Sequence, residues 1–234
     1  MPSFQTIHTA LAQNPGSTLH SIPKDGLVAE WKFDHNVKDT SGTGNNGVLS
    51  GGTAFVHGKV GQALSFDGSS GVVSVPNSPS LNFGSTGSFS ISLWMKSGQS
   101  GFGLLVDHRP NNDGVYKGYS IEDNSGLLIG RIRDGSVHDV PVFSTTNVND
   151  NQFHHVVFVV DRSVQTEYLY IDNNLQGTAD TSTVGDIDAT TNFLMGGQQL
   201  PNTPVDFYSG ILDQVRVYDR SLSPSEISVL FNER

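Results

Sequence analysis

The sequence contains no cysteine. A chain without thiols has no disulfide framework, no zinc–thiolate site and no thiol nucleophile. It also lacks any apolar run near the length of about 18 residues that marks a membrane-spanning helix. Residues 1–25 lack the apolar core of a secretory signal peptide. Disulfide and thiol chemistry are therefore excluded, and we expect no insertion into a membrane.

Basic residues are also scarce. The 234 residues include 13 Lys and Arg against 23 Asp and Glu, for a formal net charge of −10. Proteins hold nucleic acids largely by neutralising phosphates with Lys and Arg, and no basic cluster occurs in this sequence. We therefore expect no nucleic-acid partner, and anionic polysaccharides are disfavoured on the same grounds. An acidic surface instead suits a hard cation such as calcium.

Glycine and short β-branched runs are abundant. Glycine accounts for 26 of the 234 residues, which suggests many tight turns. Residues 156–160 are apolar on both faces, which predicts a central strand covered on both sides. Residues 88–95 alternate strictly, as in a half-buried strand, with one apolar face made of Phe89, Ile91, Leu93 and Met95.

The C-terminal part of the sequence predicts a strand and then a helix. Ser223 is a good helix N-cap, Pro224 suits the first helical position and Glu226 completes a capping box, so we expect a short helix over 224–232. The alternation before it predicts a strand whose one face carries Ile211, Asp213, Val215 and Val217.

The sequence divides into two parts. Residues 1–25 are polar and contain the breakers Asn14-Pro15-Gly16, which predicts an N-terminal extension or linker. Residues 26–234 are predicted to form a single domain, because all-β domains often reach this length.

Five segments, in order, resemble the laminin G-like (concanavalin A-like) β-sandwich family. The most specific is DNQFHHVVFVVD (150–161), similar to the family's W/F-H-H-V strand. The hairpin YLYIDNNLQG (168–177) follows it, similar to L-Y-x-D-G. The other three are LVAEWKFD (27–34) with DTSGTGNNG (39–47), GQALSFDG (61–68) with VVSVP (72–76), and GILDQVRVYDRSLS (210–223).

The resemblance implies an all-β fold, a two-sheet antiparallel jelly-roll β-sandwich with a short C-terminal helix. Proteins on this scaffold are mostly sugar- or matrix-binding modules found outside cells or on their surfaces. We therefore expect an extracellular or cell-surface module that binds a glycan or cell-surface polysaccharide. Whether it belongs to a larger multidomain or oligomeric assembly stays open. Fold alone does not identify the ligand.

Many members of this family also hold a calcium ion, and the loop 39–47 offers carboxylate, amide and hydroxyl oxygens of the kind calcium takes. The closing strand is expected near the first strand, which would bring its carboxylate to the same place. The alternative is a loop satisfied by its own backbone amides. Glu30 is a further possible ligand, and the predicted calcium ligands are Asp34, Asp39, Asn45 and Asp213.

The segment DHRPNNDGVYKGY (107–119) is predicted to be a loop that contacts a ligand. Sugars are bound by planar hydrogen-bonding side chains together with an aromatic platform, and binding sites favour loops held by a rigid scaffold. Arg131 shares a strand face with Arg133 and could extend the site. The alternatives are an ordinary polar hairpin and a solvated strand face. The predicted ligand-binding residues are Arg109, Asn112, Tyr116, Tyr119 and Arg131.

The neighbouring histidines His154 and His155 are predicted to be structural. Successive side chains on a strand point to opposite faces, so the two rings cannot chelate one ion without a bulge. One ring is expected to point inward, as in the family pattern.

Catalysis is the least favoured function. Glycoside cleavage needs two carboxylates at a defined separation, and the sequence contains no E-x-D-x-x-E strand of the laminarinase type. Glu122 and Asp123 are adjacent, which on a strand points them apart. No G-x-S-x-G motif is present either. We expect a non-catalytic, lectin-like module. The alternatives are a structural or protein-binding laminin G-like module such as a fibre tip and, less favoured, a glycan-cleaving enzyme.

Overall fold

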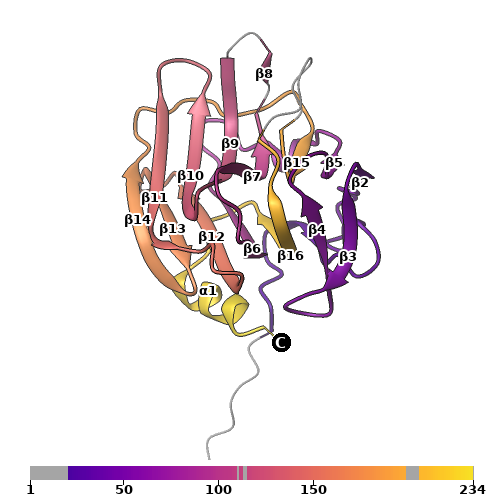
Figure 1. Ribbon diagram of the computed structural model, residues 1–234. Helices are drawn as coiled ribbons and strands as arrows, with labels where there is room; N and C mark the ends of the chain where they lie inside the picture. The colour runs from indigo at the N-terminus through magenta and orange to yellow at the C-terminus, as the bar shows by residue number, and fades with distance from the viewer. Residues whose placement is uncertain (1–20, 110, 113–114, 199–205, 234) are drawn as a thin grey trace, which may run out of the picture.

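The computed structural model describes residues 21–109, 111–112, 115–198 and 206–233. Within them, two antiparallel β-sheets face each other, and a short helix lies at the C-terminal end (Figure 1). This is the expected two-sheet sandwich. In this part of the chain, no helix has the length and apolar character needed to span a bilayer. Most of the proposed N-terminal extension, residues 1–20, lies outside the described residues.

The first sheet contains β1 (Leu27–Trp31), β3 (Thr53–His57), β4 (Gln62–Asp67), β6 (Phe89–Lys96), β12 (Phe153–Asp161), β13 (Thr166–Ile171), β14 (Asn174–Asp180) and β16 (Ser209–Tyr218). Their order is β14-β13-β12-β6-β16-β4-β3, and β1 pairs with β16. The first and last strands of the domain are therefore neighbours.

The second sheet contains β2 (Val48–Ser50), β5 (Val72–Val75), β7 (Phe102–His108), β8 (Asn111–Asn112), β9 (Val115–Asn124), β10 (Leu127–Asp134), β11 (Asp139–Asn147) and β15 (Phe193–Met195). Their order is β11-β10-β9-β7-β15-β5-β2, and β8 pairs with β9. A 3-10 turn, Pro79–Leu81, connects β5 toward β6.

The core lies between the two sheets. The apolar face predicted for β6 is confirmed, because all four of its apolar side chains are buried in this core. The strand is not half-buried as expected, since Ser90, Ser92 and Trp94 on its other face are buried as well. Aromatic rings dominate the packing, with Trp31 stacked on Phe193 at 5.3 Å and Phe89 stacked on Phe83 at 4.5 Å between ring centroids. Such offset aromatic pairs add to the stabilisation from buried area.

The outer face of the first sheet is covered by α1 (Pro224–Phe231), which begins with the predicted Ser223–Glu226 capping box. Val157 and Val159 of β12 pack with buried apolar residues of the helix. Trp94, also on this side, stacks on Phe231 with ring centroids 5.8 Å apart. The prediction that β12 is covered on both sides is therefore confirmed, and the helix supplies one of the covers.

The closing strand β16 differs from its predicted alternation. A register shift interrupts its pairing with β6 between Asp213 and Arg216, and Gln214 has a positive φ of 48°. This bulge inserts an extra residue and reverses the side to which later side chains point. Leu212, Val215 and Val217 therefore face the core, whereas Asp213 pairs beside Trp94 on the other side.

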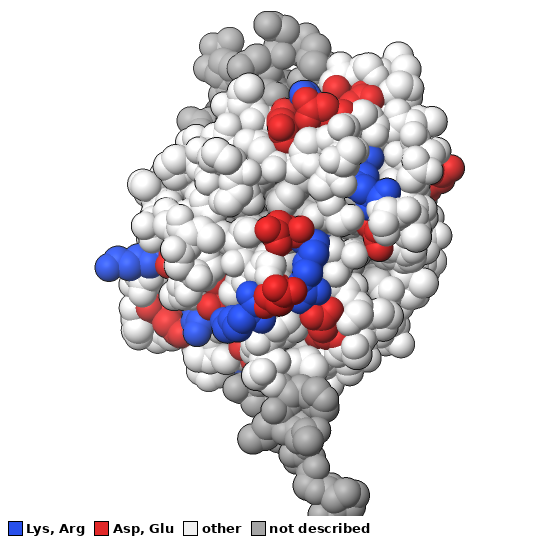
Figure 2. Space-filling view, turned by 180° about the vertical axis from the view of Figure 1, so that it is seen from behind, with Lys and Arg blue, Asp and Glu red and all other residues white. Residues whose placement is uncertain are grey.

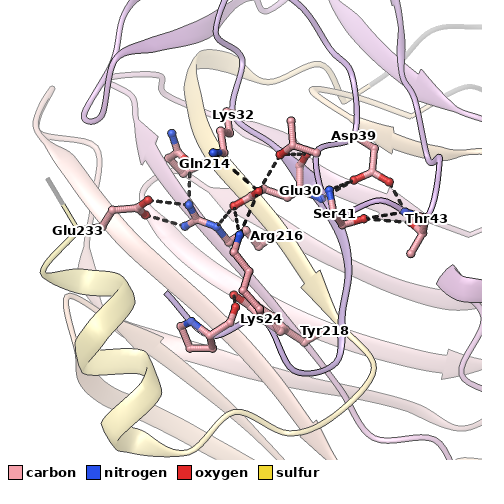
Figure 3. A network of polar contacts seen from close by, with 12 residues as sticks. Lys24, Glu30, Lys32, Asp39, Ser41, Thr43, Gln214, Arg216, Tyr218 and Glu233 are labelled. Carbon is pink, nitrogen blue, oxygen red and sulfur yellow. Dashed lines mark hydrogen bonds and ion pairs between the residues drawn. The ribbon is translucent and has the colours of Figure 1, made fainter. Parts of the chain in front are cut away.

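A buried guanidinium ties the two ends of the domain together (Figure 3). Arg216 on β16 donates to Glu30 of β1 at 2.9 Å and to both carboxyl oxygens of Glu233, after α1, at 2.7 Å each. Glu30 also accepts from Thr40 at 2.7 Å. The carboxylate of Glu30, considered above as a calcium ligand, thus takes part in this network.

One ionisable side chain lies between the sheets without a partner. Glu167 on β13 is fully buried, in the same alternation as Leu169 and Ile171. Neither of its carboxyl oxygens has a hydrogen-bond partner among the described residues. Burial raises its pKa from 4.5 to about 9, and the attraction of Arg131 and Arg162 only partly offsets this. The Glu167 side chain is therefore protonated and neutral near neutral pH.

Glu167 should make the folded protein less stable as the pH rises. Between its usual pKa of 4.5 and its folded value of about 9, the unfolded chain carries a carboxylate and the folded protein a carboxylic acid. Folding then takes up a proton. The stabilisation is fully present below the lower pKa and is lost toward the upper one, by at most about 1.4 kcal/mol per pH unit. Glu167→Gln removes this loss.

The test is urea unfolding of wild type and Glu167→Gln at several pH values from about 5 to about 8.5. As the pH rises across this range, we expect the free energy of unfolding of the variant to increase progressively relative to that of the wild type. Other titrating carboxyls affect both proteins alike and cancel in the difference. Parallel pH profiles for the two proteins would contradict the assignment of a neutral buried Glu167.

Candidate ligand-binding site

Three of the predicted ligand residues lie together on the outer face of the second sheet. The strand pairing places Asp107 of β7 and Arg131 of β10 opposite Ser120 of β9. Directly paired residues point to the same side of a sheet. Arg109, which directly follows β7, and Tyr116 of β9 continue the same two-residue alternation. Arg109 pairs with Asp107, and its guanidinium lies near the Tyr116 ring. Three strands thus present their polar side chains to one surface.

We call the charged group at this surface the arginine cluster; it is centred on Arg109, which is only 7% exposed. Its guanidinium donates to Asp107 at 2.5 Å and to Glu122 at 2.9 Å. The same oxygen of Glu122 accepts from Arg131 at 3.2 Å. The cluster consists of Arg109, Arg131, Arg133, Asp107, Glu122 and Asp139.

The rim of the cluster is more open. Asp139 on β11 accepts from Arg131 at 2.7 Å and from Arg133 at 2.8 Å. The guanidinium of Arg133 lies over the Tyr116 ring at 5.1 Å from its centroid, and that of Arg109 at 5.9 Å. These cation–π contacts hold the half-buried tyrosine against the cluster. Planar donors and an aromatic ring therefore converge here.

The charges of the cluster nearly cancel. Burial opposes the charge of Arg109, but Asp107 and Glu122 outweigh it and raise the pKa of the guanidinium. Burial raises the pKa of Asp107 to about 6, which Arg109 counteracts and Glu122 reinforces. Three guanidinium groups thus face three carboxyl groups. On the face drawn in Figure 2, basic side chains likewise adjoin acidic ones without a broad basic patch. An arginine cluster whose charges are balanced suits an uncharged polar ligand better than a polyanion.

Tyr119 does not lie with the other predicted ligand residues. It belongs to β9 and not to a loop, and it points to the opposite side from Tyr116, into the core. Its side chain is fully buried, and its hydroxyl donates to Leu81 at 2.9 Å. The expectation that its ring stacks on a ligand is therefore not met. Asn112 lies in β8, but its side chain is outside the described part of the structure.

The three carboxylates of the cluster, Asp107, Glu122 and Asp139, were not among the predicted site residues, and neither was Arg133, although its shared strand face with Arg131 was noted. Asp107 and Glu122 are the two that lie at its buried centre. They lie 15 positions apart in the sequence and come together only because β7 pairs with β9. Each follows a two-residue alternation with a polar neighbour, Arg109 and Ser120 respectively. That alternation is a signal of a shared polar face.

The loop that was predicted to bind calcium is satisfied by its own backbone. The two carboxyl oxygens of Asp39 accept from the amides of Glu30, Ser41, Gly44 and Asn45 and from the Thr43 hydroxyl, at 2.8–3.0 Å. Burial opposes ionisation of Asp39, but these hydrogen bonds lower its pKa overall. These amide and hydroxyl donors already occupy the Asp39 lone pairs that a bound cation would need.

Asn45, another predicted calcium ligand, is likewise occupied by hydrogen bonds within the protein. Its side-chain amide is buried and donates to Val28, Thr43 and Ser80 at 2.8–2.9 Å. The backbone carbonyl of Asn45 accepts from the indole N–H of Trp31 at 2.8 Å. The Asp39–Asn45 loop thus anchors the first strand.

The other two predicted calcium ligands flank a different loop. Asp34 accepts from the amide of Gln62 at 2.9 Å, and Asp213 accepts from the amide of Val60 at 2.9 Å. Asp213 is fully buried, and its second oxygen has no hydrogen-bond partner among the described residues. Burial raises its pKa to about 6, and the nearby charge of Asp34 raises it further. The described residues contain no group of three or more His, Cys, Asp or Glu suited to a metal.

The two neighbouring histidines point apart, as predicted. His155 is buried beside Trp94, with ring centroids 5.0 Å apart, and contacts Ser92 at 2.9 Å. His154 lies on the other side between Asp172 and Asp150, at 2.7 and 3.1 Å. Both rings therefore have structural partners.

Comparisons with known proteins agree with this architecture. The sequence model of the concanavalin A-like lectin/glucanases superfamily matches residues 67–228. Paraclostridial mosquitocidal protein 1 of Paraclostridium bifermentans is 25% identical over 228 residues, which cover 89% of this chain and 18% of that protein. Its solved binding domain superposes with a TM-score of 0.77 at 21% identity, over 89% of this chain and 52% of that domain.

Two further solved structures share the fold. Domain 4 of AbnA, an extracellular arabinanase of Geobacillus stearothermophilus, was solved with arabinotriose; it gives a TM-score of 0.66 at 21% identity, over 88% of this chain and 98% of that one. The binding domain of botulinum neurotoxin DC, solved with rat synaptotagmin II, gives 0.72 at 18% identity, over 91% and 52%. The chain thus spans about half of the toxin binding domains that it resembles.

Arg109→Ala should destabilise the protein far more than Arg133→Ala. The first change leaves Asp107 and Glu122 buried without their shared cation, which costs about 3–5 kcal/mol. The second removes a partly exposed pair with Asp139, which contributes about 0–1 kcal/mol. Urea unfolding of both variants measures the difference. Similar losses would mean that the buried centre of the cluster is no more important for stability than its rim.

Proposed function

The chain belongs to the concanavalin A-like lectin/glucanase superfamily, and from that premise we propose that it is a non-catalytic module that binds a neutral glycan outside the cell or at its surface. The arginine cluster on the second sheet is the proposed site. The observation that carries the proposal is the convergence of Tyr116 with the Arg109, Arg131 and Arg133 guanidinium groups on one face.

The geometry of the cluster supports binding to sugar hydroxyls. Guanidinium groups are planar donors with fixed directions, and their carboxylate partners supply acceptors beside them. Tyr116 adds an aromatic surface for the C–H face of a sugar ring. Because the side chains are held by ion pairs before a ligand arrives, little conformational entropy is lost on binding.

The environment of the carboxylates supports binding without cleavage. Glycosidases need one carboxyl group as acid and another as nucleophile or base. In the cluster, Asp107 and Glu122 are 1% and 3% exposed, and both are paired to Arg109. A carboxylate held by a guanidinium is a poor nucleophile, because the ion pair stabilises its charge.

Two of the similar structures support a binding function for this protein, but they do not identify its ligand. The arabinanase domain of the same fold holds arabinotriose, which is a neutral sugar. The botulinum domain was solved with a protein, synaptotagmin II. A protein-binding module is therefore the second candidate. It is favoured by the exposed apolar side chains Phe102, Leu127 and Phe143 on strands of the second sheet.

We also propose that calcium binds at Asp34 and Asp213, beside the loop that contains Val60, and not within the 39–47 loop. The unpartnered oxygen of Asp213 and its raised pKa fit a site that gains from a cation. Calcium takes about six to eight oxygens, many of them from backbone carbonyls and water. The Asp39 carboxylate lacks a free lone pair for that role.

Binding of neutral oligosaccharides should depend on the rim of the cluster. We expect Tyr116→Ala and Arg131→Gln each to weaken binding by about tenfold or more, equivalent to about 1.4 kcal/mol. Lys38→Ala, which removes an exposed cation outside the cluster, should leave binding unchanged. Titration on a glycan array followed by calorimetry measures this. Full affinity in both variants would mean that the glycan binds elsewhere on the protein. Binding to synaptotagmin-like proteins but to no glycan would favour a protein-binding module.

Calcium should raise the melting temperature through Asp213. An ion that binds only the folded state stabilises it by about 2.7 kcal/mol at a concentration of about 100 times its Kd. We expect Asp213→Asn to abolish the difference between calcium and chelator. Asp39→Asn should lower the melting temperature in both conditions but preserve the difference. Identical wild-type melting curves with calcium and with chelator would contradict the proposal.

A further inference from the structure

A pocket lies on the opposite side of the molecule from the arginine cluster, on the outer face of the first sheet. Its volume is about 550 Å³, within the range of about 300–1,000 Å³ that is usual for ligand sites. The pocket is bounded by β13 on one side and by the start of α1 on the other. It shares no residue with the arginine cluster.

Two tyrosines form the aromatic wall of this pocket. Tyr168 and Tyr170 are two residues apart on β13, so both rings project from the same face. They are half-buried against the apolar layer under α1, which includes Val159 and Leu222. No hydrogen bond to either hydroxyl occurs among the described residues, so each combines an anchored ring with a free polar end. Such side chains are typical of binding sites.

The opposite wall is polar and already held in place. Arg220 donates to both oxygens of Glu226 at 2.6 and 3.0 Å, and Glu226 in turn accepts from the amide of Ser223 at 2.9 Å. Asp161 lies at the edge and accepts from Ser163 at 2.6–2.9 Å. These fixed donors and acceptors stand opposite the two rings across the pocket.

We propose that this pocket is a second, independent carbohydrate subsite that binds one or two units of a neutral sugar. The Tyr168 and Tyr170 rings pack on the C–H face of the sugar. The Arg220–Glu226 pair and the tyrosine hydroxyls bond its hydroxyl groups. The proposal shares its ligand class with the proposed function but not its site.

The charges of the pocket select against anionic sugars. The charged residues that line the pocket are one cation, Arg220, and two carboxylates, Asp161 and Glu226. The side-chain pair with Arg220 lowers the pKa of Glu226 to about 2 despite partial burial, so this carboxylate stays ionised. An added carboxylate or sulfate would meet net negative charge, which disfavours its binding. The same side chains accept hydrogen bonds from uncharged hydroxyls at no such cost.

Ligand-observed saturation-transfer NMR and calorimetry with arabinotriose, cellotriose and lactose test the proposal. The proteins are wild type, Tyr168→Ala, Tyr170→Ala, and Tyr116→Ala at the other site. We expect Tyr168→Ala and Tyr170→Ala each to weaken sugar binding at the pocket by about tenfold. Neither should change the sugar binding that Tyr116→Ala weakens at the arginine cluster. Tyr168→Phe and Tyr170→Phe keep the rings and should retain most of the affinity. Their melting temperatures, with those of the alanine variants, report whether the fold is preserved.

The outcomes separate the two sites. If Tyr168→Ala and Tyr170→Ala lose sugar binding but Tyr116→Ala does not, the pocket is supported and the arginine cluster is not the glycan site. Loss only in Tyr116→Ala overturns the pocket and keeps the proposed function. Wild-type protein that binds none of the three sugars at millimolar concentration overturns the pocket as a neutral-sugar subsite. Unchanged affinity in both β13 alanine variants overturns it as well.

Discussion

The buried guanidinium of Arg109 organises the outer face of the second sheet. A cation that is 7% exposed is tolerated only when carboxylates and hydrogen bonds replace its water. Asp107 lies two residues before it, near the end of β7, and Glu122 comes from the neighbouring strand β9. Once these three are in place, Glu122 can also hold Arg131. The arrangement of the whole candidate site therefore depends on one ion-paired cation.

The two outer faces of the sandwich are used differently. On the first sheet, α1 covers much of the surface, and Arg216 fastens its end to β1 and β16. That side mainly stabilises the fold, because it joins segments from both ends of the chain. The second sheet has no helix over it among the described residues, and its polar side chains meet the solvent at Asp139 and Tyr116. This difference explains why the proposed principal site lies on the second sheet.

Local patterns in the sequence were enough to predict much of the fold. The alternation in β6, the apolar run of β12 and the Ser223–Glu226 capping box each depend on neighbours within a few residues, and each is confirmed. The family resemblance added the two-sheet sandwich and the position of the closing strand beside the first strand, which the β1–β16 pairing confirms. These features are local because side-chain direction in a strand or a capped helix follows directly from sequence spacing.

The failures all involve information that local spacing does not contain. The positive φ at Gln214 introduces a bulge in β16, so Asp213 leaves the apolar face. Tyr119 was predicted in a loop, but β9 begins earlier and turns its ring into the core. Asp107 and Glu122 meet at Arg109 only because of the register of β7 against β9. Cross-strand register is set by tertiary packing, which a single sequence does not specify.

If a neutral glycan binds over β9 and β10 at the arginine cluster, it changes the surroundings of the backbone amides on these strands. Amide chemical-shift mapping of isotope-labelled protein, titrated with a neutral oligosaccharide that binds, tests it most directly. We expect the amides around Tyr116, Arg131 and Arg133 to shift in a saturable way. Saturable shifts elsewhere in the protein, with none in β9 or β10, would contradict it.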